Sequence, residues 1–189
     1  MSVPLVRRRF TVEDYHRMGE AGIFSENDRV ELIEGEIVEM TPIGSRHAGY
    51  VDRLVRIFFR ALGDRVQVRV QNPVRLGKHS EPQPDVALLK PRIDFYAASH
   101  PEPRDVLLVV EVVEGSASYD REVKVPLYAR TGIEEVWLVD LAKGCVEVYR
   151  NPGGGGYAEM RQLWRGDCLA PAAFPDAVVA VKDLLGPDL

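Results

Sequence analysis

The sequence predicts a mixed α/β (α+β) fold in which helices flank a central mixed sheet, with a β-hairpin near each end of the chain. Residues 107–113 are almost continuously apolar and lack the alternation of a half-exposed strand, so both faces of this strand must be covered. Residues 120–131 have the pattern of a helix and precede a second apolar strand at 136–140, which together predict a strand–helix–strand crossover. The length of 189 residues fits one domain spanning 1–189.

The N-terminal segment predicts a helix followed by a hairpin. Thr11 is a suitable helix N-cap, and Asp14 lies near the positive end of the helix dipole. Residues 29–33 and 36–40 alternate between polar and apolar side chains on either side of a Glu-Gly pair, which is typical of a hairpin with one exposed face. The chain is therefore expected to begin with antiparallel structure.

An amphipathic helix is predicted at 48–62, because its apolar residues recur at intervals of three and four. Its polar face carries Arg53, Arg56 and Arg60, which are candidates for nucleic-acid binding. Residues 43–80 contain eight basic side chains and two acids, a balance of +6, although the whole chain carries a net charge of −5. A local basic surface is enough to meet a phosphate backbone. The alternative is a solvated, arginine-rich helix face.

The remaining elements alternate between short strands and helical segments. They are strands at 66–70, 73–76 and 86–89, a long connection at 91–105, a glycine-rich hairpin formed by 145–150 and 157–163, and a short helix at 181–185. Pro126 conflicts with the predicted helix at 120–131 unless it lies in the first turn or kinks the helix. Gly132 provides a suitable end for that helix.

The composition argues against a membrane protein. No stretch reaches the roughly 18 to 20 consecutive apolar residues of a membrane span. The start of the chain lacks the apolar core of a signal peptide. We therefore expect a cytoplasmic protein without a membrane partner.

Two carboxylates lie where the sequence is most apolar. Asp85 opens the strand at 86–89, and Glu111 interrupts the strand at 107–113. Burying a carboxylate costs several kcal/mol unless a cation or hydrogen-bond donors replace its water. If the two strands pair, both carboxylates can converge on one Mg²⁺ or Mn²⁺ ion, with the backbone carbonyl of Val112 as a third ligand. Such an ion would activate water for phosphodiester hydrolysis.

The residues around these acids resemble a known family. The pattern comprises Pro84-Asp85, Glu111-Val112-Val113, Lys124 within 120–129, the strand at 137–140, the acidic segment 31–36 and the helix start at 45–47. Over about residues 10–185 the chain resembles the Uma-type restriction-endonuclease-like family, and through it the PD-(D/E)XK nuclease superfamily. The resemblance implies a restriction-endonuclease-like sheet flanked by helices and metal-dependent cleavage of DNA.

The resemblance also implies roles for individual residues. Asp85 and Glu111 match the two metal-binding acids. The usual lysine would stand two residues after Glu111, where this chain has Val113, so Lys124 on the following helix is expected to reach the same space as the catalytic lysine. His47 matches an upstream auxiliary residue by position. The other possible auxiliary residues are Glu34 and Glu36 from the hairpin and Gln83, which would steady Asp85 from the same strand face.

Each candidate also has a purely structural interpretation. A Pro-Asp pair is common in turns, so Asp85 can serve a turn alone. Glu111 can form an internal salt bridge with Lys124, and Lys124 can otherwise face solvent. His47 can cap its helix or face solvent.

The sequence as a whole favours a divalent-metal-dependent endodeoxyribonuclease. We expect a homodimer, because cutting two strands with one site per chain favours two-fold symmetry. One alternative is a nucleic-acid-binding protein that keeps the nuclease fold without efficient catalysis, as Val113 suggests. Another is a metal-free hydrolase with two carboxylates that acts on glycosidic bonds. The apolar strands offer no aromatic platform for a sugar, which disfavours this last alternative.

Overall fold

A central six-stranded sheet organises the molecule, whose computed structural model describes residues 7–25, 27–115 and 118–187. In spatial order its strands are β3 (Gln67–Val70), β4 (Val86–Leu89), β5 (Val106–Val113), β6 (Glu135–Asp140), β7 (Cys145–Gly153) and β8 (Gly156–Trp164). Strands β5 and β6 run parallel, whereas the other neighbouring pairs are antiparallel. The mixed sheet and its crossover are therefore confirmed.

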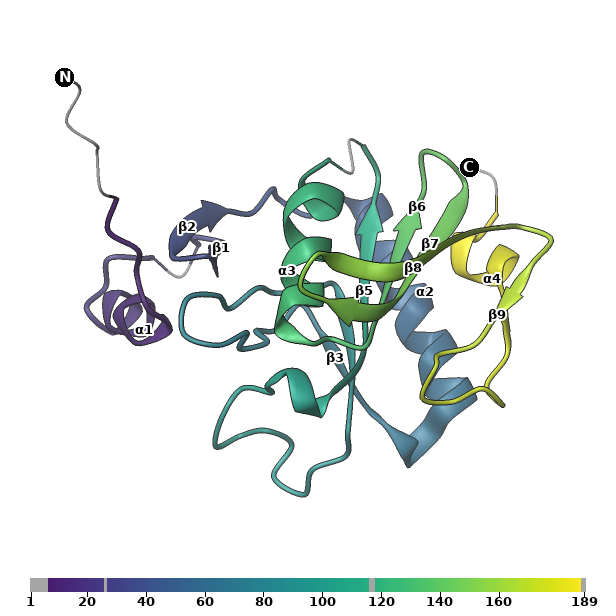
Figure 1. Ribbon diagram of the computed structural model, residues 1–189, viewed down its shortest axis with the longest axis horizontal. Coiled ribbons are helices and arrows are strands. Elements are labelled where there is room, and N and C mark those ends of the chain that lie inside the picture. Colours follow the sequence, from purple (N-terminus) through teal and green to yellow (C-terminus); the bar gives the residue numbers. More distant parts are fainter. Residues whose placement is uncertain (1–6, 26, 116–117, 188–189) are drawn as a thin grey trace.

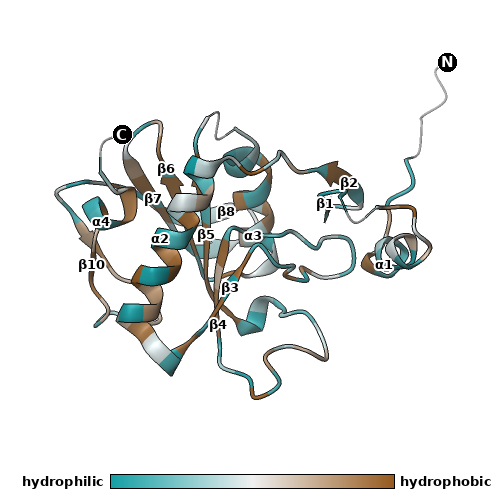
Figure 2. Ribbon diagram, turned by 180° about the vertical axis from the view of Figure 1, so that it is seen from behind, coloured by the Kyte–Doolittle hydropathy of each residue, from teal (hydrophilic) through white to brown (hydrophobic). Residues whose placement is uncertain are grey.

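Helices cover the two faces of this sheet. Helix α2 (Ser45–Leu62) lies on one face and α3 (Val125–Thr131) on the other (Figures 1 and 2). The side chains of β5 alternate between these layers, because successive residues of a strand point to opposite faces. Val110 and Val112 join the core beneath α2, while Val109 and Val113 join the core beneath α3. Glu111 therefore belongs to the face that α3 covers.

The N-terminal elements lie beside the sheet (Figure 1). They are α1 (Val12–Glu20) and the antiparallel hairpin of β1 (Val30–Ile33) and β2 (Glu36–Glu39). Thr11 and Asp14 form a capping box at the start of α1, where each side chain accepts a hydrogen bond from the backbone of the other. A bridge between Leu32 and Glu81 joins the hairpin to the rest of the molecule.

Smaller elements complete the fold. They are the 3₁₀ turns η1 (Gly63–Arg65) and η2 (Pro103–Asp105), the short pair β9 (Cys168–Leu169) and β10 (Val179–Ala180), and helix α4 (Val181–Leu185). Helix α4 packs into the same core as α2. Within the described ranges, no helix combines the length and the apolar character that a membrane crossing requires.

The strand expected at 73–76 is absent. This segment folds back on itself, because Val74 N–H donates to the carbonyl of Pro82 at 2.9 Å and Leu76 N–H to that of Ser80 at 2.8 Å. Val74 and Leu76 are nevertheless buried. The apolar residues of a packed loop therefore gave the sequence the same pattern as a short strand.

The crossover helix begins with a wide turn. Residues Asp120–Lys124 form the π-helical segment η3, which α3 continues until Gly132 ends it in a left-handed conformation with φ of 83°. Pro126 directly follows the π-helical segment, where Val125 N–H donates to Asp120 five residues back, so the regular ladder of hydrogen bonds is already interrupted where the N–H of Pro126 is missing. This position resolves the conflict between Pro126 and the helical pattern.

Candidate active site

Asp85 and Glu111 meet at one end of the central sheet. Val86 pairs with Val110, and one further step along this antiparallel register places Asp85 opposite Glu111 on the same face. The Asp85 N–H donates to Glu111 Oε2 at 3.1 Å, and the Val112 N–H donates to Asp85 Oδ2 at 2.8 Å. The two acids therefore converge, as the sequence predicted from their strands.

The second oxygen of Asp85 has two side-chain partners. His47 Nε2 lies 2.8 Å from Asp85 Oδ1, and Gln71 Nε2 donates to the same oxygen at 3.2 Å. His47 comes from the first turn of α2, and Gln71 directly follows β3. The hydrogen bond to Asp85 raises the pKa of His47, although burial opposes the shift. Together with the Val112 N–H, these groups fix the orientation of the Asp85 carboxylate.

The negative charge of buried Glu111 is only partly compensated by its neighbours. Its Oε1 accepts a hydrogen bond from Tyr128 Oη at 2.7 Å and lies 3.3 Å from Lys124 Nζ. Burial raises the pKa of Glu111 to about 8, against the positive charge of Lys124 and with a further rise from Asp85. A second positive charge near these acids would favour the ionised form of Glu111.

Lys124 reaches the acids from the helix that covers them. Its ammonium lies 3.3 Å from Glu111 Oε1 and 3.5 Å from Glu31 Oε2, and only 6% of the residue is exposed. Burial lowers its pKa, but the charges of Glu111 and Glu31 outweigh burial and raise the pKa overall. Val113, which occupies the usual lysine position, packs into the core beneath α3. The structure therefore brings Lys124 to Glu111 from a different element.

These groups line a cavity of about 550 Å³. The acids in its lining are Glu31, Glu39, Asp85, Glu111, Glu114 and Asp120, and Tyr119 adds a hydroxyl. Burial raises the pKa of Asp120, although Lys124 opposes the shift. The hydroxyl of Tyr119 is buried, and it has no hydrogen-bond partner within the described part of the chain. A polar ligand or water in the cavity would satisfy this hydroxyl.

The donor set fits a hard divalent cation. The backbone N–H of Asp85 contacts the Glu111 carboxylate, both acids line one cavity, and Mg²⁺ and Mn²⁺ prefer carboxylate oxygens as ligands. The N–H and C=O of one strand residue point to the same side, so the Val112 carbonyl faces the side of β5 on which Asp85 lies. All three residues line the cavity.

Three predicted auxiliary residues do not contact these acids: Glu34 pairs with Arg130 at 2.7 Å and does not line the cavity, and Glu36 and Gln83 also have other partners. Gln83 and Asp85 both precede β4, and the side chain of Gln83 donates to the carbonyl of Val30 at 3.0 Å, so it does not steady Asp85 as expected. Glu36 is exposed, pairs with Arg7 at 3.6 Å and does not line the cavity. Gln83 does line the cavity, but Gln71 makes the contact with Asp85 that Gln83 was expected to make.

Sequence reasoning missed Glu31 and Gln71. Glu31 alternates with apolar neighbours, which predicted an exposed position, yet it is 2% exposed because Lys124 and the backbone of Gln83 contact it. Gln71 becomes recognisable once the register is known, since Val70 pairs with Val86 and the next step sets Gln71 beside Asp85. The pairing of distant strands is the missing information in both cases.

The three candidate arginines line a different groove. Arg53, Arg56 and Arg60 lie along a groove of about 740 Å³ between α2 and α4, together with Asp52 and Asp183. Its lining residues are distinct from those around Asp85 and Glu111. The basic face of α2 is therefore separate from the acidic cavity.

A family model described as "Putative restriction endonuclease" matches residues 12–182. The chain belongs to the Uma2 family. Comparison with solved structures supports the Uma2 fold: a crystal structure described as "a putative nuclease belonging to DUF820 from Anabaena variabilis ATCC 29413" aligns with a TM-score of 0.70 and 16% sequence identity. The alignment covers 93% of this chain and 97% of that one. The predicted family and fold are confirmed, while a comparison with curated proteins gave no match.

Proposed function

We propose that the protein is a divalent-metal-dependent endonuclease that hydrolyses phosphodiester bonds in DNA. The observation that carries this proposal is the meeting of Asp85, Glu111 and Lys124 beside one cavity, from two strands and a helix. Membership of a family described as restriction endonucleases supports a nuclease. The acids also remain incompletely neutralised, which suits a site that takes up a cation.

Asp85, Glu111 and the Val112 carbonyl would hold Mg²⁺ or Mn²⁺. When bound, such an ion polarises a phosphoryl oxygen and lowers the pKa of water. His47 and Gln71 orient Asp85 for this task, and Tyr128 orients Glu111.

Lys124 has a separate role in the proposed reaction. Its ammonium lies between Glu111 and Glu31, where it would donate hydrogen bonds to the scissile phosphate and offset the charge that develops there. Burial among fixed partners keeps this cation in place before the substrate arrives.

DNA is the substrate that the family description favours, since restriction endonucleases cut duplex DNA. The basic face formed by Arg53, Arg56 and Arg60 would contact phosphates outside the cleaved bond. A homodimer stays a prediction, which light scattering of the purified protein checks.

Plasmid cleavage tests the proposal. Supercoiled plasmid should become nicked or linear with Mg²⁺ or Mn²⁺, and EDTA should stop the reaction. Asp85→Asn and Glu111→Gln should each lower the rate at least about 100-fold. Glu36→Gln is the matched control, because Glu36 is an exposed acid outside the cavity. Cleavage by both acid variants at the unmodified rate would contradict the proposal.

One observation favours a second candidate, a nuclease-fold protein that binds nucleic acid without cutting it. Lys124 is engaged by Glu31 as well as Glu111, and Val113 leaves the usual position without a lysine. This candidate predicts DNA binding that persists in EDTA and in both acid variants. It also predicts no metal-dependent nicking by the unmodified protein.

A further inference from the structure

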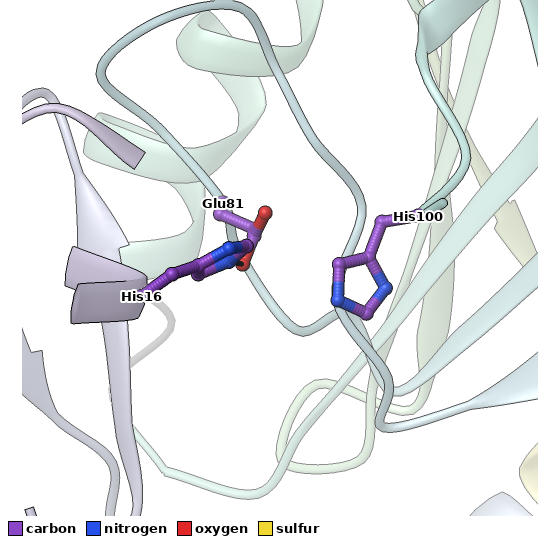
Figure 3. Close-up of side chains that lie close together, drawn as sticks. All are labelled: His16, Glu81 and His100. Carbon is purple, nitrogen blue, oxygen red and sulfur yellow. Dashed lines mark hydrogen bonds and ion pairs between the residues drawn. The ribbon is translucent and has the colours of Figure 1, made fainter. Parts of the chain in front are cut away.

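A second cluster of metal-binding side chains lies away from the acidic cavity. One ring nitrogen of His16, one of His100 and one carboxylate oxygen of Glu81 all lie within 4.8 Å of one another. Figure 3 shows these side chains reaching the cluster from three separate segments. His16 comes from α1, Glu81 from the loop before β4, and His100 from the long connection before β5. Segments distant in sequence thus place two imidazoles and a carboxylate together.

The carboxylate of Glu81 is the unusual member of this cluster. The residue is 2% exposed, and its Oε1 lies 2.7 Å from His16 Nε2. Its Oε2 is buried and has no hydrogen-bond partner in the part of the chain that the structure describes. A buried carboxylate oxygen without a partner loses its hydration without compensation, which costs free energy. A ligand at this oxygen would remove that cost.

The backbone already holds the three segments together. Val12 N–H, in the first turn of α1, donates to the carbonyl of Lys78 at 2.9 Å, and Arg75 N–H donates to that of Pro101 at 2.9 Å. The loop that carries Glu81 is therefore bonded both to the helix that carries His16 and to the connection that carries His100. A site formed on these segments is positioned before a ligand binds.

His16 contacts Glu81, but the two neighbouring arginines do not pair with it. Arg75 pairs with Glu13, and no ion pair joins Arg69 to Glu81 in the described ranges. Arg69 instead lies 3.4 Å from His100 Nδ1, a long contact for a hydrogen bond, and its Nη1 is buried without a partner. A metal ion would replace the long contact with Arg69.

We propose that His16, Glu81 and His100 bind a zinc-type divalent ion. Two imidazoles and one carboxylate are ligands that Zn²⁺ accepts, and a water from the adjoining cavity of about 380 Å³ would complete four-coordination. Ligand atoms of a tetrahedral zinc site lie about 3.3 Å apart, which falls within the 4.8 Å limit on the separations of these three ligand atoms. The bound ion would tie α1 to the loop before β4 and to the long connection.

Zinc titration tests this site apart from the acidic cavity. The experiment uses an Asp85→Asn background, which weakens zinc binding at the other site, and measures competition with a chelating dye in excess Mg²⁺. This background should bind one equivalent of Zn²⁺, and adding either His16→Ala or His100→Ala should weaken binding at least about tenfold. His79→Gln is the matched control, because His79 lies outside the cluster and contacts the carbonyl of Phe10.

Cobalt supplies a readout that does not depend on activity. Co²⁺ should give visible absorption bands that His16→Ala removes and His79→Gln retains. His16 has a partly exposed side chain, so its removal should leave the fold intact, as circular dichroism checks. Zinc binding that is absent, or equal in the His16 and His79 variants, would overturn the proposal. The cluster would then be a hydrogen-bonded network that water completes.

Discussion

Two buried charge clusters have their cations only three residues apart in η3. Arg121 pairs with Asp140 and Glu147, and Lys124 pairs with Glu31 and Glu111. The clusters differ in how completely their acids are paired. Arg121 donates to Glu147 through Nε at 2.8 Å and through Nη2 at 2.9 Å, and it also binds Asp140. Lys124 lies at the longer distances of 3.3 Å and 3.5 Å from its two acids. The guanidinium makes a planar, bidentate contact that an ammonium cannot make. We therefore call the Arg121 cluster closed and the Lys124 cluster open.

The pKa values of the two glutamates move in opposite directions. Burial acts to raise the pKa of Glu147, but hydrogen bonds from Arg121 and Tyr149 lower it to about 2. Burial raises the pKa of Glu111 to about 8, because Lys124 compensates it less completely. Of these two glutamates, only Glu111 lines the acidic cavity. We therefore propose that the closed cluster stabilises the fold, whereas the open cluster serves to bind a cation.

Removing the cation from each cluster should separate stability from activity. Lys124→Met should lower plasmid cleavage at least about 100-fold, since the proposed charge next to the phosphate is lost. Its unfolding free energy should fall by only about 1 kcal/mol, because Glu111 can be protonated and water can enter the cavity. Arg121→Met should cost about 3 kcal/mol, because Asp140 and Glu147 stay buried and keep only the more distant Lys143 as a cation.

Urea unfolding and cleavage assays on the same preparations check this contrast. Cleavage by Arg121→Met, measured below its unfolding transition, should match the unmodified protein. Equal losses of stability in the two variants, with cleavage intact in both, would remove the distinction between the clusters.

The pH dependence of stability should have opposite signs at the two glutamates. Glu147 has a folded pKa below its ordinary value of 4.5, so its contribution is present above pH 4.5 and is lost as the pH falls toward 2. Glu111 has a folded pKa above that value, so its contribution is present below pH 4.5 and is lost as the pH rises through 8. Unfolding free energies in EDTA should therefore decline at both extremes.

Two neutral variants assign these declines. Glu147→Gln should flatten the acid limb, and Glu111→Gln should flatten the limb between pH 4.5 and 8. A pH profile that neither substitution changes would mean that other groups control stability.

The sequence predicted the elements of the sheet well because its strands are long or strongly apolar. The uninterrupted run in β5 required cover on both faces, and α2 and α3 provide it. The strand predicted at 73–76 failed because burial alone does not distinguish a packed loop from a strand. Periodicity reports which residues are buried, but it does not report which backbone groups they bond.

The same limit applies to the prediction of site residues. Asp85 and Glu111 were recognisable from the sequence alone, because each places a charge within or beside an apolar strand. Gln71 and Glu31 were not, since each joins the site only through contacts with residues far away in the chain. The same limit explains the choice of Gln83, which is near Asp85 in sequence but bonds to the N-terminal hairpin.

The smallest expected effect concerns charges that remain in water on the face of α2. Arg56 and Arg60 line the groove outside the acidic cavity, so they should strengthen DNA binding without contributing to bond cleavage. Arg56→Ala combined with Arg60→Ala should weaken DNA binding several-fold, and the slope of log affinity against log salt should fall by about 2 if each arginine meets one phosphate. Cleavage at saturating DNA should stay unchanged.

Fluorescence anisotropy across a salt series checks the change in DNA binding, with Arg161→Ala as the control for an exposed arginine on a different element, β8. A slope equal to that of the unmodified protein would show that this face of α2 is simply solvated. The comparison of charge clusters would then concern only the closed cluster of Arg121 and the open cluster of Lys124.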